Sequence, residues 1–327
     1  ECINSIISQI KELREQCEVV LVDDGSTDSS GAICDKYQAL QPEIIKVFHN
    51  TNHGLLLTRR YGFEQAIGEY IINCDSDDKL EYGALQKLKD AIFDYDKPDV
   101  ILFNHFLYTG NDKQVAFKNV FTNENACVVK KDVVLKEFLL CHSVVSVCGK
   151  ICKRSCINVN KDYSEFARIS NGEDTLQSIE FFNEANTFVY LNEELYDYRI
   201  GSGMTRNYDP NYYFVFKTVI EQIETQNGVW MLPNFDKLVA VKVLATAGRA
   251  ITQSRYNKWN SHSEHKDYLR KIHDDEMFKR NATLLNDVKE SLQKDHVILL
   301  LLLKMRWYGL LILLLEIKNR LDAEKSK

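Results

Sequence analysis

Short apolar runs alternate with helical patterns over the first third of the chain. The runs at residues 18–22, 44–48 and 70–74 lack the apolar–polar alternation of a half-buried strand, which is typical of strands buried on both faces of a parallel sheet. Between them, turn residues and capping side chains predict helices that end near residue 37 and span residues 55–66. This alternation predicts a doubly wound α/β sheet, in which ligands bind outside the carboxyl ends of the strands.

Strands and helices still alternate after residue 80, but longer polar turns separate them. Helices are expected at residues 83–93, 132–140 and 175–183, and strands at 99–107, 144–151, 187–191 and 195–199. A glycine-containing segment at residues 201–205 follows, and the pattern beyond it is helical. We therefore expect one α/β domain over residues 1–205, itself divided near residue 108, and a helical region over residues 206–327.

The last expected helix, after residue 294, is apolar on almost every side. Its two apolar runs, residues 297–303 and 307–315, are interrupted by Lys304 and Arg306, so neither reaches the ~18 uncharged residues of a membrane-spanning helix. Further basic residues follow, and Trp307 lies beside the cations. Residues 295–321 are expected either to lie in the interface of an anionic membrane or to pack on protein, on the α/β domain or on a second copy in a homo-oligomer.

Two acidic turns follow expected strands. Asp23 and Asp24 come after the first, and Asp75, Asp77 and Asp78 come after the third. Two ionised carboxylates about 5 Å apart repel by roughly 3 kcal/mol at an effective dielectric constant of about 20, so a tight acidic cluster on a strand end favours a bound cation. Oxygen ligands of this kind suit Mg²⁺ or Mn²⁺. The alternative is a polar turn that caps the next helix.

A second acidic pair, Glu173 and Asp174, follows Asn171-Gly172 at the start of an expected helix. The partial positive charge of a helix N-terminus helps to keep a carboxylate ionised. Taken alone, the pair is most simply a helix cap.

Composition narrows the classes of function. The 327 residues carry a net charge of −6, which argues against a general nucleic-acid-binding protein, and 45% apolar with 27% charged residues is typical of a globular protein. The nine cysteines have no disulfide-like spacing and indicate reduced thiols in the cytoplasm. Cys148, Cys152 and Cys156 recur every four residues, which matches no common zinc or cluster motif.

Four segments together resemble the ordered signature of glycosyltransferase family 2. They are residues 21–28 (LVDDGSTD), Asn52-His53-Gly54 with Arg59 and Gly62, residues 68–78 (GEYIINCDSDD), and Gly172-Glu173-Asp174. The resemblance is strongest over residues 1–110 and faint beyond 205. It implies a GT-A fold: a nucleotide-sugar-binding half at residues 1–108, an acceptor-binding half carrying the catalytic base at 109–205, and a C-terminal helical region at 206–327.

The resemblance also implies roles for the nucleotide-binding residues. Asp24, together with Asp23, resembles the carboxylate that reads the nucleotide base, and Arg59 resembles a basic contact to the nucleotide. Asp75 and Asp77 match the D-x-D positions that hold the ribose and a divalent metal, Mn²⁺ or Mg²⁺, on the diphosphate. Asp78 shares one of these two tasks.

On the acceptor side, the family's pattern points to Asp174, with Glu173 beside it, as the general base. Lys150 resembles a recurrent lysine before that pair, and its role stays open. The family's members usually begin with a central strand, which is missing before Glu1, so the chain resembles an N-terminally truncated member. Arg60 stands where an asparagine is common, and we expect it to point to solvent rather than into the nucleotide pocket.

The resulting hypothesis is an inverting, metal-dependent glycosyltransferase of the hexosyltransferase type. It would move a sugar from a nucleotide-diphospho-sugar, a UDP-sugar, to a hydroxyl of a glycan or lipid-linked acceptor in cell-surface polysaccharide synthesis, in the cytoplasm or at the inner face of the plasma membrane. Two alternatives stay open: a non-catalytic nucleotide-sugar-binding module of the same fold, and a nucleotidyltransferase-like enzyme that also uses paired carboxylates and a metal.

Overall fold

The computed structural model describes residues 1–10, 13, 16–110, 112–140, 143–201 and 208–325. The chain forms two compact units, Glu1–Gly203 and Met204–Lys327. The boundary that the sequence predicts after residue 205 falls within residues 202–207, outside the described residues.

The first part of unit 1 alternates helices and strands as the apolar runs predict. In chain order the elements are α1 (Cys2–Ile10), β1 (Val19–Asp23), α2 (Ser30–Leu40), β2 (Ile45–His49), α3 (Leu55–Gln65), β3 (Tyr70–Ile72), β4 (Lys79–Leu80), α4 (Ala84–Asp94) and β5 (Val100–Thr109). Each acidic turn follows a strand, because the apolar side chains of the strand are buried while the carboxylates need a polar environment.

The second part of unit 1 differs from the expectation at two strands. Its elements are β6 (Asp112–Val115), β7 (Ala126–Val129), α5 (Lys131–Leu140), β8 (Lys150–Lys153), α6 (Glu173–Glu184) and β9 (Phe188–Arg199). The expected strand at residues 144–151 is wrong for most of its length, because a turn and a 3₁₀ helix at Val147–Gly149 precede β8. The two short strands expected at 187–199 are one continuous strand, β9, which pairs with three neighbours.

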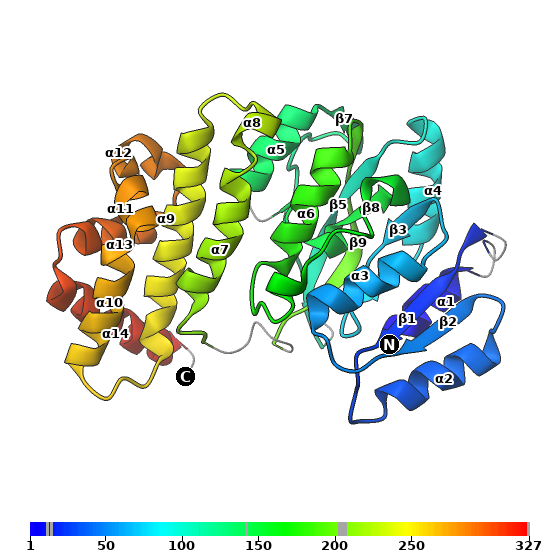
Figure 1. The fold of residues 1–327 in the computed structure, drawn as a ribbon, viewed down its shortest axis with the longest axis horizontal. Coiled ribbons are helices and arrows are strands. Elements are labelled where there is room, and N and C mark those ends of the chain that lie inside the picture. Colours follow the sequence, from blue (N-terminus) through cyan, green and yellow to red (C-terminus); the bar gives the residue numbers. More distant parts are fainter. Residues whose placement is uncertain (11–12, 14–15, 111, 141–142, 202–207, 326–327) are drawn as a thin grey trace. The chain divides into compact units, whose positions relative to one another are not determined.

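Seven strands form the main sheet, in the order β3-β8-β5-β9-β4, with β6 beside β5 and β7 beside β9 (Figure 1). β1 and β2 form a separate parallel pair. In the main sheet β5 and β9 are parallel, whereas β3–β8, β5–β8 and β4–β9 are antiparallel. The sequence predicts a mostly parallel sheet, but the strand directions are mixed. β8 lies between β3 and β5 and runs antiparallel to both.

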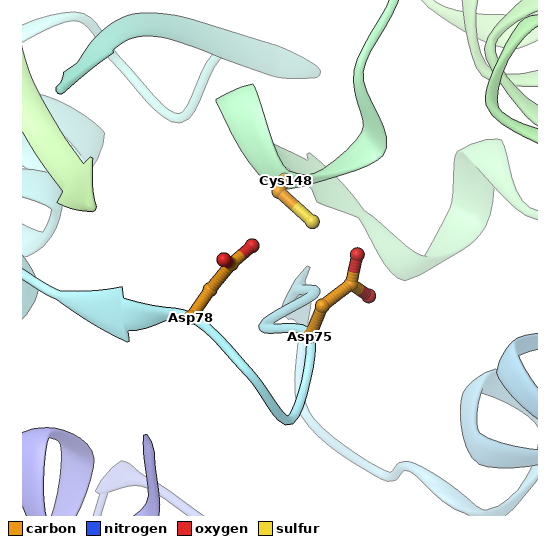
Figure 2. Close-up of side chains that lie close together, drawn as sticks. All are labelled: Asp75, Asp78 and Cys148. Carbon is orange, nitrogen blue, oxygen red and sulfur yellow. The ribbon is translucent and has the colours of Figure 1, made fainter. Parts of the chain in front are cut away.

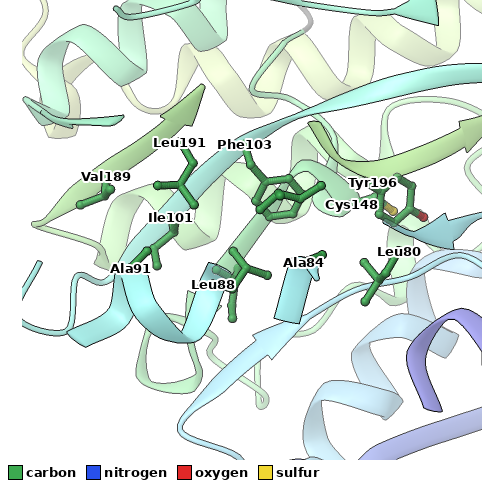
Figure 3. Close-up of a cluster of buried hydrophobic side chains, with 12 residues drawn as sticks. Leu80, Ala84, Leu88, Ala91, Ile101, Phe103, Cys148, Val189, Leu191 and Tyr196 are labelled. Carbon is green, nitrogen blue, oxygen red and sulfur yellow. The ribbon is translucent and has the colours of Figure 1, made fainter. Parts of the chain in front are cut away.

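The hydrophobic core of unit 1 lies between α4 and the main sheet. Figure 3 shows Ala84, Leu88 and Ala91 facing Ile101 of β5 and Val189 of β9. Full burial of such a leucine or isoleucine contributes about 1.5–3 kcal/mol. Aromatic contacts of α6 add a second buried layer, in which Phe182 packs edge-on against Phe138 and Phe188. This packing fixes β3, β9 and the start of α6, which carry the acidic groups.

Unit 2 is helical throughout its described residues, as predicted. Its helices are α7 (Tyr212–Glu224), α8 (Asn227–Trp230), α9 (Phe235–Gln253), α10 (His262–Asp274), α11 (Glu276–Ala282), α12 (Leu285–Val288), α13 (Lys294–Lys304) and α14 (Tyr308–Lys325). The central helix α9 packs closely on α13 at Gly248, where an added Cβ would lie 2.7 Å from the ring of His296.

The single helix expected after residue 294 is two helices. Arg306 adopts a left-handed backbone conformation with φ of 61°, which ends α13 and turns the chain into α14. An ion pair of 2.6 Å between Asp295 and Lys318 joins the far ends of the two helices, so they form a hairpin. Among the described residues, no helix is both long and apolar enough to cross a bilayer.

Candidate functional site

Asp75 lies in the turn after β3, and its carboxylate accepts hydrogen bonds from two neighbours. Arg59 Nη2 donates to both oxygens, at 2.9 and 2.7 Å, and Asn73 Nδ2 donates at 2.9 Å. Burial alone would raise the pKa of Asp75, but the positive charge of Arg59 and these hydrogen bonds outweigh it, and the pKa is lowered. Asp75 is therefore held ionised.

Arg59 connects this turn with the acidic pair of α6. Its side chain in α3 is only 5% exposed, and Nη1 donates to Asp174 Oδ1 at 2.5 Å. The charges of Asp174 and Asp75 raise the pKa of the guanidinium against the effect of its burial. One guanidinium thus brings together residues from α3, the β3–β4 turn and α6.

Glu173 and Asp174 are the first two residues of α6, as the sequence predicts. Gly172 caps the helix with φ of 98°, a left-handed conformation that glycine adopts without a steric penalty. Burial and the negative charge of Asp174 raise the pKa of Glu173 to about 7. Near neutral pH Glu173 is therefore about half protonated, whereas the Asp174 carboxylate is ion-paired to Arg59.

Asp78 is the most buried of the three aspartates after β3. Its Oδ2 accepts a hydrogen bond of 2.7 Å from the Tyr196 hydroxyl, and its Oδ1 accepts one of 2.7 Å from the backbone N–H of Arg199. Burial raises the pKa of Asp78 to about 6. The Tyr196 hydroxyl also accepts a hydrogen bond from the Asp75 backbone N–H, so β9 holds both aspartates.

One group of described residues has the spacing of a metal site. Ligand atoms of Asp75, Asp78 and Cys148 all lie within 4.8 Å of one another, and Figure 2 shows the Cys148 thiol directed toward the space between the two carboxylates. Complete burial raises the pKa of the Cys148 thiol, which leaves it protonated and a weak ligand. The two carboxylates fit a hard divalent cation such as Mg²⁺ or Mn²⁺.

Asp77 does not belong to this group. Its side chain is exposed, and its backbone oxygen accepts hydrogen bonds from Arg199 Nε and from the Tyr108 hydroxyl. That Asp77 binds the metal stays a prediction, and Asp78 is the better-placed partner of Asp75 in this geometry.

Asp23 and Asp24 lie at the end of β1, and the side chain of each accepts hydrogen bonds from the backbone of a nearby turn. Asp23 accepts a hydrogen bond from the Ser26 N–H and contacts the His49 ring at 3.0 Å. Asp24 accepts from the backbone N–H groups of His53 and Gly54, at 2.7 and 2.9 Å. Because Gly54 caps the N-terminus of α3, Asp24 helps to position the helix that carries Arg59. Their contact with a nucleotide base stays a prediction.

Lys150 is fully buried, and its Nζ donates to protein acceptors. These acceptors are the carbonyl oxygens of Val145 and Ser146 and the hydroxyl of Ser178 on α6. Burial lowers the pKa of Lys150 to about 8. The lysine ties the turn before β8 to α6, and its predicted substrate contact stays untested.

Arg60 corrects another expectation. Its side chain is buried rather than directed to solvent, and its Nη1 donates to Glu180 at 2.9 Å. The neighbouring arginines of α3 therefore serve two different carboxylate partners on α6.

Several residues of the site could not be found from the sequence. Tyr196 and Arg199 reach the aspartates from β9, and Cys148 reaches them from the turn before β8. Arg168 donates to the Asn52 side chain and joins the loop before α6 to the turn before α3. None of them lies in a recognisable motif, and only pairing and packing place them here.

A comparison with protein families gives the site its context. Residues 1–135 match the model of "Glycosyl transferase family 2". Over this part of its length the chain is similar to glycosyltransferase family 2. The matched residues contain both acidic turns and Arg59, whereas Glu173 and Asp174 lie beyond them.

Curated relatives of this chain include proteins of Streptococcus pneumoniae and Bacillus subtilis. Glycosyltransferase GlyG of Streptococcus pneumoniae is 29% identical over 216 residues, which are 62% of this chain and 66% of GlyG. Glycosyltransferase GlyA of the same organism is 28% identical over 62% of this chain and 29% of its own length. The minor teichoic acid biosynthesis protein GgaA of Bacillus subtilis is 33% identical over 33% of this chain and 24% of its own length. The chain thus spans less than two thirds of these relatives.

Solved structures of TarS from S. aureus resemble the whole chain in fold. TarS 1-349 superposes with a TM-score of 0.65 at 20% identity and covers 94% of this chain and 83% of its own. Its complex with UDP-GlcNAc gives 0.62 at 21% identity, over 90% and 84% of the two chains. The expected GT-A fold, followed by a helical C-terminal region, is confirmed.

Proposed function

We propose that the chain is an inverting, metal-dependent glycosyltransferase that moves a sugar from a UDP-sugar to a hydroxyl of a glycan or lipid-linked acceptor. The observation that carries the proposal is the shared hydrogen bonding of Arg59, which sets Asp75 of the acidic turn beside Asp174 of α6. The complex of TarS with UDP-GlcNAc supports a UDP-sugar donor, and the name of GgaA supports a role in cell-surface polysaccharide synthesis.

On the donor side of the reaction, charged side chains would bind the nucleotide-sugar. Asp23 and Asp24 would bind the nucleotide base, and Arg59 would orient the diphosphate. Asp75 with Asp78 or Asp77 would hold a divalent cation, Mn²⁺ or Mg²⁺, which would supply Lewis-acid stabilisation of the leaving nucleoside diphosphate. Asp75 is held ionised in this structure, which suits a cation ligand.

The acceptor side needs a base. Asp174 would accept the proton of the acceptor hydroxyl while that oxygen attacks the anomeric carbon from the face opposite the diphosphate, whose bond to the carbon breaks. Attack from the opposite face inverts the configuration. Burial and the charge of Asp174 raise the pKa of Glu173 to about 7, so Glu173 would carry its proton in part of the population near neutral pH.

A transfer assay with variants tests this function. We expect the chain to transfer or hydrolyse at least one UDP-sugar in the presence of Mn²⁺ or Mg²⁺, and Asp174→Asn to lower the rate by about 10²- to 10⁴-fold. Asp132→Asn is the matched control, since Asp132 also lies in the first turn of a helix, α5, but is exposed and outside the site. Full activity of Asp174→Asn would contradict the mechanism. UDP binding without turnover would instead favour the non-catalytic module.

We also infer that the hairpin of α13 and α14 contacts an anionic membrane surface. Its exposed apolar side chains recur every three or four residues, namely Ile298 and Leu301 on α13, Met305 directly after it, and Leu310, Leu313, Ile317 and Leu321 on α14. Trp307, 53% exposed, lies at the turn between the helices, the type of residue that prefers a membrane interface.

Charge favours a lipid surface over a second copy of the chain. Residues 294–322 contain five basic and three acidic side chains, against a net charge of −6 for the whole chain. The three acidic groups are ion-paired, Asp295 with Lys318, Glu316 with His262 and Asp322 with Arg255. Two such basic surfaces would repel each other, whereas anionic headgroups would attract them. This contact would place the enzyme at the inner face of the plasma membrane.

A further inference from the structure

Two thiols touch each other beside the acidic turn. Cys2 is the first residue of α1, and Cys74 lies between β3 and Asp75. Their sulfur atoms are 3.6 Å apart, and both cysteines are free and half-buried. Cys2 Sγ also donates to the backbone oxygen of Asp75 at 3.5 Å.

Packing holds this thiol pair together. Ser5 Oγ of α1 accepts a hydrogen bond from the Leu80 backbone N–H of β4, and Gln9 Oε1 accepts one from the Leu85 N–H of α4. Leu80 belongs to the core between α4 and the main sheet, and Leu85 packs against that core, so α1 cannot move away from the β3–β4 turn without breaking these contacts. Two groups held at contact distance react far faster than the same groups free in solution.

We propose that Cys2 and Cys74 form a modification site at which a two-electron oxidant of the peroxide class converts the two thiols into a disulfide. The Cys2 sulfur attacks one peroxide oxygen, the O–O bond breaks, and one water leaves, which gives a sulfenic acid on Cys2. The Cys74 sulfur then attacks the Cys2 sulfur, the S–O bond breaks, and a second water leaves. Both thiol protons end in water, and the peroxide takes up the two electrons. A disulfide needs about 2.05 Å between the sulfur atoms, a short approach from their present contact.

The disulfide would act on the neighbouring Asp75. Closing the bond pulls the backbone at Cys74 toward α1 and removes the Cys2 S–H that donates to the Asp75 oxygen. Asp75 shares Arg59 with Asp174, so a shift of this turn changes the geometry of both carboxylates. This consequence rests on the proposed transferase function, whereas the formation of the disulfide does not.

Peptide mapping tests the modification directly. The chain is treated with hydrogen peroxide, its remaining thiols are alkylated, and non-reduced peptides are mapped by mass spectrometry. We expect a Cys2–Cys74 linked peptide that has lost two hydrogen atoms and that dithiothreitol cleaves. Cys2→Ser and Cys74→Ser should each abolish it, and Cys127→Ser, at a half-buried cysteine of β7, should not. Peroxide treatment that leaves both cysteines alkylatable, or that links other pairs instead, would overturn the proposal.

Activity provides the second readout. Oxidation should lower the rate of UDP-sugar transfer by about tenfold or more, because it displaces a residue of the site. Dithiothreitol should restore the rate. Peroxide should not change the rate of the Cys2→Ser variant. If Cys2→Ser fails to fold, Cys74→Ser serves in its place. If peroxide links Cys2 to Cys74 but the reduced chain never transfers sugar, the proposed function is refuted and the thiol site stands. A chain that transfers sugar without forming the link would refute the thiol site alone.

Discussion

Arg59 and Asp174 are joined by a hydrogen bond of 2.5 Å, although 115 positions separate them in the sequence. The same guanidinium holds Asp75, so one positive charge serves two carboxylates that motif reasoning assigns to opposite sides of the reaction. Loss of this charge would leave two partly buried carboxylates facing each other.

Arg59→Lys should lower sugar transfer strongly. A lysine carries one compact charge and lacks the planar fork that reaches Asp75 and Asp174 together. We expect a loss of about 10²-fold in kcat/KM, measured by transfer kinetics with the donor varied. Arg60→Lys is the control, because Arg60 is equally buried on α3 but pairs with Glu180. If both variants lose activity equally, the loss reflects damage to α3 rather than to the shared bond.

Glu173→Gln should stabilise the chain at alkaline pH. Burial and Asp174 raise the pKa of Glu173 from 4.5 to about 7, so the folded state gains stability from the bound proton below pH 4.5 and loses it as the pH rises through 7. Glutamine mimics the protonated form at every pH. The variant should therefore gain up to about 3 kcal/mol over the wild type between pH 5 and pH 8. Urea denaturation across this range measures the difference, and a constant difference would contradict the assignment.

Metal binding should depend on Asp75 and Asp78. A ligand present at about 100 times its dissociation constant stabilises the folded state by about 2.7 kcal/mol, so Mn²⁺ with UDP should raise the melting temperature of the wild type. Asp75→Asn and Asp78→Asn should each abolish the Mn²⁺-dependent part of the increase. Asp77→Asn decides between the two predicted ligand sets: a retained increase supports Asp78, and a lost increase supports Asp77.

The hairpin should bind anionic vesicles through its apolar face. Replacement of Leu310, Leu313 and Ile317 by serine removes apolar area that a membrane would bury, and we expect flotation with phosphatidylglycerol vesicles to be lost. Binding of the wild type should weaken at high salt.

Serine at Val229 and Met231, which are exposed in unit 2 but outside the hairpin, should leave flotation unchanged. Equal flotation of the wild type and the hairpin variant would refute membrane contact. A change in oligomeric state in the hairpin variant, with no flotation of either, would point to a second copy instead.

Local pattern was enough to predict most secondary structure and the positions of the motifs. Apolar runs place the strands before Asp23 and Asp75, and the turn before Glu173 places the start of α6, because these features depend on residues close in sequence. The local pattern gave a wrong prediction where the backbone conformation of a single residue ends a helix. Arg306, in a left-handed conformation, divides the apolar C-terminal segment into two helices.

The tertiary structure alone decided which of these groups meet. Side chains from β9 bury Asp78 rather than Asp77, Lys150 points to α6 rather than to an open site, and Arg59 joins Asp75 to Asp174. The residues in these contacts lie 16 to 118 positions apart, and no local periodicity encodes them. The sequence by itself determined the chemistry available at each strand end and helix start. Packing of α6 against both α3 and β9 decided which charges share a partner, because only burial brings them within hydrogen-bonding distance.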